Sequence, residues 1–391
     1  MNVYNEAQVR EAGTLQKIWR AEESFVLLAG KLELSFLPGY LAQIPAEYER
    51  GHFALLTSGS TGRPKLILGA KRRTAALARL LHSVQQSEAV TAAVLALPIS
   101  YSYAFVNQVV WSIEMERRLR ITGGVAAPNE LAAALEEESN SMLCLVGAQL
   151  PLLFAAFGEK QFPRVTRIHF AGGRFPQERL TRLAQTFPNA RVFNNYGCAE
   201  AMPRLTVRPA EQYTEGAIVG APLPGIEMKL GEESALLFRS PYRAVAIVDE
   251  TGFRAIADEE WLPSGDRAEQ IAGGSWRLLG RNNEVFKRFG EKISLSALLQ
   301  EIRAQWPGEA AFYTETDKYS ELAHVLVLSP APAPAQVTAI LQALRKTHPR
   351  PHWPVRIESL PALPLSVNNK VDTQALAAES PEKVVEWRLR Y

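Results

Sequence analysis

The chain has 391 residues, of which 47% are hydrophobic and 21% are charged, with 43 Lys and Arg residues against 41 Asp and Glu residues. This is the composition of a globular protein, and the length fits two or three domains. The formal net charge of +2 creates no overall field for nucleic acid or an anionic membrane, so we expect neither as a partner.

The cysteines and the first residues indicate the cellular compartment. Cys144 and Cys198 are too few for a disulfide framework or a four-thiolate zinc site. Glu6 and Glu11 stand where a secretory signal would have its apolar stretch. The longest apolar run, 142–157, is interrupted and too short to span a bilayer. The sequence therefore predicts a cytoplasmic protein with reduced thiols.

Strands and helices are predicted to alternate through the middle of the chain. Residues 89–97 form a continuous apolar run that ends at Pro98, which is typical of a strand buried on both faces. The elements that follow are helix 103–116, strand 119–122, helix 128–138, strand 142–146, helix 151–157, strand 165–170, helix 176–187 and strand 191–194. This alternation predicts an α/β fold with a parallel sheet flanked by helices. Ligands bind such sheets at the carboxyl ends of the strands.

The pattern changes after residue 216. Short runs separated by Gly and Pro predict a small antiparallel unit, and the charged stretch 281–288 resembles a connection between domains. Beyond it we expect a small α+β domain, whose clearest helix is 334–347 with its apolar residues at helical spacing. The predicted organisation is a large domain over 1–280 and a small carboxy-terminal domain over 281–391.

The most informative local sequence begins at Thr57. It reads Thr57, Ser58, Gly59, Ser60, Thr61, Gly62, Arg63, Pro64, Lys65. Its glycines allow close backbone approach, its hydroxyls and N–H groups suit anionic oxygens, and its lysine supplies a charge for phosphate. A Walker loop is excluded, because two residues separate Gly62 from Lys65 and a leucine follows the lysine. The stretch is either an ordinary polar turn or a phosphate-binding loop of another kind.

Five further motifs decide between these alternatives. They are Ala171-Gly172-Gly173-Arg174, Asn194-Asn195-Tyr196-Gly197-Cys198-Ala199-Glu200, Trp261 to Asp266, Gly280-Arg281 to Gly290, and Leu363 to Asp372. Each alone would be a common turn or a solvated linker. Together and in this order they resemble the signatures of the adenylate-forming superfamily, which includes acyl- and aryl-CoA ligases, luciferases and the adenylation domains of peptide synthetases.

The resemblance implies how ATP and Mg²⁺ would bind as cofactors. The loop over 57–65 would cradle phosphates, Asp266 and Arg281 would bind the ribose, and Glu200 would be the metal ligand. The residues implied to surround the adenine, with the tyrosine ring stacked on it, are Gly173, Arg174, Asn194, Asn195, Tyr196 and Gly197.

The resemblance also implies two half-reactions and a mobile carboxy-terminal domain with its hinge at Asn283. A carboxylic acid would first attack the α-phosphate of ATP, giving an acyl-adenylate and pyrophosphate, with Lys370 bridging the two anions. Rotation about the hinge would then withdraw Lys370 and bring Lys287 over the site, where a thiol takes the acyl group and AMP leaves. The implied catalytic residues are Lys370, Glu200 and Lys287.

The sequence departs from the family pattern at several places. Ala199 replaces the common Thr, as it does in the aryl-acid-activating branch, and Asn369 replaces the Gly that normally precedes the lysine. Only 56 residues precede Thr57, so we expect a compact member that lacks most of the amino-terminal subdomain. A second copy of the chain, in a homodimer, or a carrier protein would then cover the exposed wall.

The acid and the acceptor stay open at this point. The implied acyl pocket, which would suit an aryl or medium-chain acid, consists of residues that ordinary core packing would explain equally: Tyr101, Tyr103, Phe105, Cys198 and Met202. The thiol would belong to CoA or to the phosphopantetheine of a carrier protein acting in trans, for which the basic run Lys71-Arg72-Arg73 is a candidate docking site. The alternative function is a catalytically impaired nucleotide-binding relative with a structural or regulatory role.

Overall fold

The computed structural model describes residues 1–29, 34–58, 64–172, 175–281, 285–289, 291–317, 321–366 and 371–389. The chain divides into two compact units, Met1–Ser264 with Glu269–Leu278, and Gly265–Ala268 with Leu279–Tyr391. The sequence predicts a mobile domain that begins after residue 280. The division into compact units does not show whether the second unit moves independently, so this domain boundary stays a prediction.

The first unit contains a six-stranded sheet in the order β10-β9-β8-β7-β5-β6. Its strands are β5 (Ala92–Leu95), β6 (Arg118–Ile121), β7 (Ser141–Leu145), β8 (Val165–Phe170), β9 (Arg191–Tyr196) and β10 (Thr206–Pro209). All neighbours pair in parallel except β10, which is antiparallel to β9. Numbered along the chain, the parallel strands lie in the doubly wound order 2-1-3-4-5, whose switch point falls between β5 and β7. The predicted α/β class and parallel sheet are confirmed.

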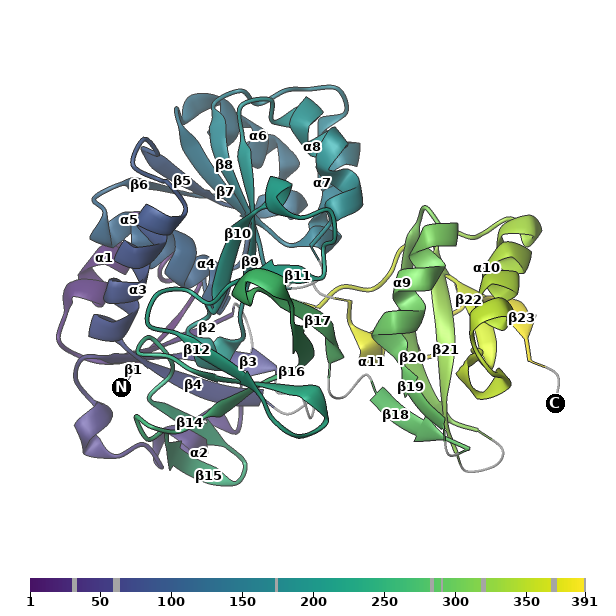
Figure 1. The fold of residues 1–391 in the computed structure, drawn as a ribbon. Helices are drawn as coiled ribbons and strands as arrows, with labels where there is room; N and C mark the ends of the chain where they lie inside the picture. Colours follow the sequence, from purple (N-terminus) through teal and green to yellow (C-terminus); the bar gives the residue numbers. More distant parts are fainter. Residues whose placement is uncertain are drawn as a thin grey trace. The chain divides into compact units, whose positions relative to one another are not determined.

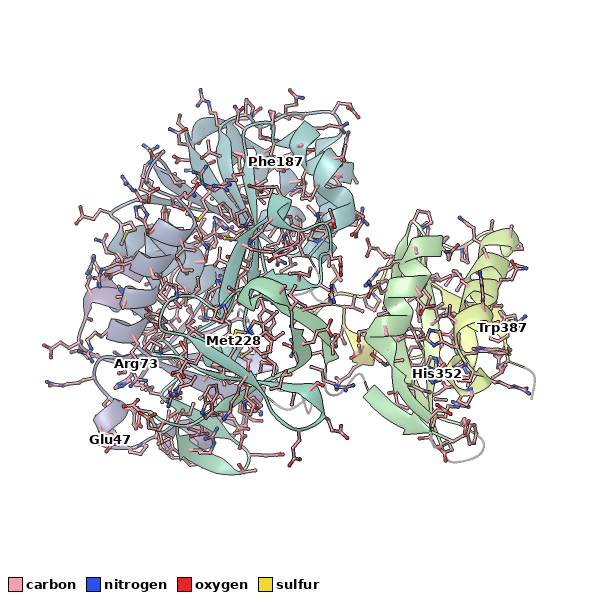
Figure 2. All side chains as sticks on the ribbon, viewed as in Figure 1. Glu47, Arg73, Phe187, Met228, His352 and Trp387 are labelled. Atoms are coloured by element: carbon pink, nitrogen blue, oxygen red, sulfur yellow. The ribbon has the colours of Figure 1, made fainter. Side chains whose placement is uncertain are left out.

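Helices cover both faces of this sheet (Figure 1). One face carries α6 (Pro128–Glu137), α7 (Leu150–Phe157) and α8 (Leu180–Thr186), which share a core with the sheet that includes Phe187, labelled in Figure 2. The other face carries α3 (Lys71–Val84), α4 (Ser102–Ala104) and α5 (Trp111–Glu114). Because side chains alternate along a strand, each strand contributes to both cores.

The helix predicted over 103–116 differs from the observed one. The observed helical segment runs from Ser102 to Glu114, and Phe105–Val110 form a π-helix between α4 and α5. Two side-chain amides, Asn107 and Gln108, are fully buried there, and Gln108 Nε2 donates to the Val94 carbonyl oxygen at 2.8 Å. Apolar periodicity does not distinguish a π-turn from an α-turn within a buried helix, which explains the difference.

The amino-terminal residues help to build a second six-stranded sheet, in the order β1-β2-β3-β4-β14-β15. Its strands are β1 (Asn2–Asn5), β2 (Phe25–Leu28), β3 (His52–Ser58), β4 (Pro64–Ala70), β14 (Ala246–Asp249) and β15 (Gly252–Ala255). The first helices, α1 (Ala12–Arg20) and α2 (Leu37–Leu41), pack against it. Among the described residues before Thr57, Val3 is the one large apolar side chain that is strongly exposed. The expected uncovered wall therefore gains no support, and the homodimer stays a prediction.

A third, five-stranded sheet has the order β11-β17-β16-β13-β12. Its strands are β11 (Ile218–Gly220), β12 (Glu227–Leu230), β13 (Ala235–Arg239), β16 (Leu262–Gln270) and β17 (Trp276–Arg281). The pairs β11–β17 and β12–β13 are antiparallel, as the pattern after residue 216 predicts.

The second unit is built on a four-stranded sheet, β20-β21-β22-β23, beside the hairpin β18–β19. These strands are β18 (Val285–Arg288), β19 (Glu291–Ser294), β20 (Glu309–Thr316), β21 (Leu322–Ser329), β22 (Arg356–Ser359) and β23 (Val384–Arg388). One face packs against α9 (Leu295–Gln305) and α10 (Pro334–Thr347), and the other against α11 (Thr373–Ala377). The bounds of α10 agree with the predicted helix. No helix in the described part of the chain has the length and apolar character that crossing a membrane requires.

Candidate active site

The carboxyl ends of the parallel strands bring together loops that are distant in the sequence. Tyr101 follows β5, Val146 follows β7 and Gly172 follows β8. Gly172 has a φ of +78°, and a Cβ there would overlap the Tyr101 hydroxyl and lie 3.4 Å from Val146 Cγ1. The switch point of the sheet therefore holds the first glycine of the motif implied to bind adenine. Gly173 and Arg174 lie outside the described residues.

The predicted phosphate loop is the connection of the β3–β4 hairpin. The two strands are antiparallel, with Thr57 opposite Lys65 and Ser58 opposite Pro64. Directly opposed residues share one face of a sheet, so Thr57 and Lys65 flank the connection from the same side. The residues between the strands, which include Gly59, Ser60, Thr61 and Gly62, lie outside the described part of the chain.

Asn194 and Asn195 point to opposite faces of β9, as neighbours in a strand must. Asn194 Nδ2 donates to the Ile218 carbonyl oxygen at 3.4 Å. Asn195 Oδ1 accepts from Gln85 Nε2 at 3.1 Å, and its Nδ2 donates to the Phe170 carbonyl oxygen at 3.3 Å. Because the Asn195 amide is occupied in the interior, its contact with adenine stays a prediction without structural support.

The turn after β9 is a tight crossing of two backbone segments. Tyr196 is 8% exposed. A Cβ on Gly197 would overlap the Pro203 carbonyl oxygen and lie 2.9 Å from Arg204 Cα. The close approach explains why glycine follows the tyrosine in this motif.

Glu200 lies in the 3₁₀ turn Ala199–Ala201 and is half-buried. Its backbone carbonyl oxygen accepts from the Ala244 N–H at 2.9 Å. Within the described ranges its carboxylate forms no ion pair, and no cluster of three or more His, Cys, Asp and Glu side chains could hold a metal by itself.

The residues of the predicted acyl pocket separate into two groups. Tyr101 and Tyr103 contact each other edge-on, with ring centroids 6.0 Å apart. The Phe105 ring instead packs within an aromatic core, where its centroid lies 5.3 Å from the centroid of the Phe53 ring. Met202 belongs to that core as well, since its methyl group approaches Gly69 beside Phe53. Cys198 is half-buried in the turn after β9. Core packing accounts for Phe105 and Met202, and the acid contacts of all five residues stay predictions.

The second unit carries the residues predicted for the ribose. Arg281 Nε lies 3.0 Å from Asp266 Oδ1, and the Asp266 side chain is 9% exposed. Arg281 is the last residue of β17, and the hinge residue Asn283 lies outside the described part of the chain. The Lys287 side chain is likewise outside it, although β18 includes its backbone.

Lys370 also lies outside the described residues, but the base of its loop is defined. Leu365 and Val371 form an antiparallel bridge, and the Asp372 N–H donates to the Pro364 carbonyl oxygen at 2.8 Å. The Asp372 carboxylate caps α11 by accepting from two backbone N–H groups at 3.1 and 3.0 Å. Asp372, for which the sequence suggested no role, therefore closes the loop that carries Lys370.

Sequence reasoning missed a buried polar network between α3, the π-helix and β9. Gln85 Nε2 donates to Asn107 Oδ1 at 3.0 Å and to Asn195, and Asn107 Nδ2 donates to Cys144 Sγ at 3.3 Å. Burial raises the pKa of Cys144 to about 12, so the thiol stays protonated. Arg204 joins the network through Asn107. The signal in the sequence is the pair Asn107-Gln108 within an otherwise apolar helix.

The basic run Lys71-Arg72-Arg73, the candidate docking site, is largely engaged in contacts within the chain. Lys71 Nζ is buried and donates to the carbonyl oxygens of Ile18, Ala21 and Glu23 at 3.1, 2.7 and 2.9 Å. Arg73, labelled in Figure 2, lies 2.7 Å from Asp258. The run therefore does not present three free charges to a carrier protein.

A family model described as "AMP-binding enzyme" matches residues 26–237, more than half of the chain. The fold and the motif residues thus define an adenylate-forming enzyme. The chain belongs to the AMP-binding enzyme family, and the prediction of an AMP-forming ligase is confirmed at that level.

Individual relatives are distant. D-alanine–D-alanyl carrier protein ligase of Bacillus cytotoxicus is 23% identical over 371 residues, which cover 85% of this chain and 71% of that protein. The anthranilate CoA ligase AuaEII in complex with anthranoyl-AMP has a TM-score of 0.72 at 16% identity, covering 94% of this chain and 80% of that one. O-succinylbenzoate coenzyme A synthetase (MenE) from Bacillus subtilis in complex with AMP has a TM-score of 0.68 at 16% identity, covering 94% and 81%. At these identities the solved structures establish the fold.

Proposed function

We propose that the chain activates a carboxylic acid with ATP and passes the acyl group to the thiol of a phosphopantetheine arm. The observation that carries the proposal is the meeting of Tyr101, Val146 and Gly172 at the switch point of the sheet, beside the strand that ends at Tyr196. The relatives named above are a carrier protein ligase and two CoA ligases. CoA and carrier proteins present the same thiol, which is the chemistry they share.

In this proposal the first unit binds the phosphates and the base. The loop between Thr57 and Lys65 would cradle the pyrophosphate that leaves, and Tyr196 would stack on the adenine. The Asp266 carboxylate would accept hydrogen bonds from the ribose hydroxyls. Arg281 would orient this carboxylate through the ion pair that the two side chains form. Holding both anions in place lowers the entropic part of the barrier.

The residues fit a magnesium ion. Glu200 is a half-buried carboxylate without a cationic partner among the described residues, and Mg²⁺ usually takes one or two carboxylates together with phosphates of the substrate. Glu200 would hold the ion, which when bound would offset phosphate charge.

Lys370 and Lys287 would act in succession. Lys370 would bridge the carboxylate and the α-phosphate while the acyl-adenylate forms, because a fixed cation stabilises the charge of that transition state. Rotation about the hinge at Asn283 would then withdraw Lys370 and bring the face that carries Lys287 over the site. The thiol would attack the activated carbonyl as AMP leaves. Staged completion of a site by domain rotation is a known device.

The test is acid-dependent exchange of pyrophosphate into ATP over a panel of aliphatic and aryl acids. Thioester mass is then measured with CoA and with a phosphopantetheinylated carrier protein as separate acceptors. Glu200→Gln should lower exchange by on the order of 10²-fold or more, while Glu47→Gln, at an exposed carboxylate labelled in Figure 2, should leave it unchanged. Nucleotide binding without exchange for any acid would favour the impaired relative instead.

A further inference from the structure

Arg204 is a buried cation that has no counter-charge in the described part of the chain. Its side chain is fully buried in the first unit. Nη2 donates to Asn107 Oδ1 at 3.1 Å, whereas Nε and Nη1 are buried and find no hydrogen-bond partner among the described residues. No carboxylate of the described residues pairs with it. The neutral Asn107 oxygen also accepts from Gln85, so it cannot balance a full charge.

This arrangement is unfavourable unless something completes it. Burial lowers the pKa of Arg204 from its usual value, but a guanidinium resists deprotonation near neutral pH. Burying a charge and leaving its N–H groups unpaired both cost free energy, and folded proteins therefore pair such groups in the great majority of cases. An anionic group that enters with a substrate would supply what is missing.

Aromatic rings connect Arg204 to the predicted active site. The guanidinium carbon lies 5.2 Å from the ring centroid of Tyr103. Tyr103 contacts Tyr101 edge-on, and the Tyr101 hydroxyl abuts Gly172 at the carboxyl end of β8. Two residues of the predicted acyl pocket thus lie between the switch point of the sheet and the buried cation.

We propose that Arg204 recognises a second anionic oxygen group, a carboxylate in the simplest case, at the far end of the acid substrate. This inference rests on the proposed function and names its substrate class: a dicarboxylic acid whose aryl or aliphatic skeleton packs on Tyr101 and Tyr103. One carboxylate would be adenylated and the other would pair with the unpartnered N–H groups of Arg204. A monoacid would leave the guanidinium unpaired, so the site would discriminate against it.

The test compares acids matched in skeleton: adipate with hexanoate, and isophthalate and terephthalate with benzoate. The quantity measured is kcat/KM of acid-dependent pyrophosphate exchange. The wild type should favour the better diacid by about 10- to 100-fold, the range expected of a hydrogen bond to a charged group. Arg204→Met should abolish that ratio.

Arg208→Met is the matched control. Arg208 is equally buried, but Nε, Nη1 and Nη2 all donate to backbone carbonyl oxygens. Its replacement should lower stability and leave the diacid-to-monoacid ratio unchanged. Should Arg204→Met fail to fold, Asn107→Asp decides the question, because a carboxylate beside Nη2 should compete with the substrate and reduce the ratio.

Two results would overturn the inference: a wild type that uses monoacids as well as diacids, or an Arg204→Met variant that loses activity equally with every acid. Exchange with monoacids alone would sustain the proposed function and refute the inference. If no acid supported exchange, the proposed function would fail. Calorimetric binding of diacid and monoacid to the wild type and to Arg204→Met would then decide the inference separately, with equal affinities refuting it.

Discussion

Gly197 illustrates how a single residue determines the geometry of the turn after β9. The Pro203 carbonyl oxygen and Arg204 Cα occupy the space that a Cβ would need. Backbone atoms cannot move aside as a flexible side chain can, so a methyl group must displace one of the two crossing segments.

We therefore expect Gly197→Ala to destabilise the chain by about 1–3 kcal/mol, the usual cost of overpacking, and to weaken binding of AMP. Gly13→Ala is the control, because nothing lies within 4 Å of its added Cβ and its φ is ordinary. Urea denaturation and calorimetric titration with AMP measure the two effects. Equal stability of the two variants would contradict this account of the turn.

His324 is a buried neutral imidazole in β21. Nε2 donates to the carbonyl oxygen of His352 (labelled in Figure 2) at 2.9 Å, and the ring lies between Phe286 and Phe312. Burial lowers the pKa of His324 to about 3, while the unfolded chain titrates near the ordinary value of about 6.5. Between these values the unfolded state binds the extra proton, so stability is complete above about pH 6.5 and is lost as the pH falls.

His324→Gln should therefore make stability less dependent on pH. One such histidine contributes about 1.4 kcal/mol per pH unit, or about 2 kcal/mol between pH 6.5 and 5. Gln can still donate to the His352 carbonyl oxygen, and the buried His169 of the first unit titrates equally in both proteins. Urea denaturation at pH 7 and pH 5 gives the comparison. An unchanged loss of stability in the variant would show that His324 is not responsible.

At the scale of elements, prediction succeeded where one residue type fixes a local geometry. The bounds of α10 follow from a proline at its first turn and a regular apolar stripe. The order of the parallel strands and the π-helix could not be predicted, because both depend on contacts between distant segments. Asn107 and Gln108 bond to neighbours on β5 and β7 that no local pattern identifies.

Lys71 shows the same limit for charge. A run of three basic residues predicts a solvated helix end, whereas Lys71 Nζ binds three carbonyl oxygens at the end of α1 and lies 5.1 Å from the ring centroid of Phe25. Burial lowers the pKa of Lys71 to about 8, so the ammonium remains mostly charged near neutral pH. The side chain thus joins α1 to the start of α3.

Lys71→Met should destabilise the chain by about 1–3 kcal/mol, because it leaves buried carbonyl oxygens without a donor. Arg72→Met, at the exposed neighbouring position, should change stability by less than about 0.5 kcal/mol. Urea denaturation of both variants against the wild type is sufficient. A destabilisation no larger than that of the control would mean that the three bonds contribute nothing net.

At the scale of the whole molecule, the motifs predicted the family because their order along the chain is itself information. The structure adds where the motifs lie. The loops after β5 and β8 meet at the carboxyl ends of the strands of a doubly wound sheet. Asp372 caps α11. The buried Arg204 was beyond sequence reasoning, since an arginine in Pro203-Arg204-Leu205 gives no sign of its burial.

Lys370 is proposed to act in the first half-reaction and not in the second. Lys370→Ala should lower acid-dependent exchange by on the order of 10²–10³, as expected when one preorganised charge is removed from a transition state. Thioester formation from a synthetic acyl-adenylate should be largely unaffected, because Lys370 would be withdrawn by then. Survival of both steps would remove Lys370 from the mechanism.

Formation of an acyl-adenylate requires that a carboxylate oxygen bond to the α-phosphorus of ATP, and isotope transfer reports this bond. An acid labelled with ¹⁸O in both carboxyl oxygens is turned over with ATP and the thiol acceptor, and the products are analysed by mass spectrometry. We expect one ¹⁸O in AMP, one in the thioester and none in pyrophosphate, because the attacking oxygen leaves with AMP. Unlabelled AMP, or label in ADP or phosphate, would contradict it.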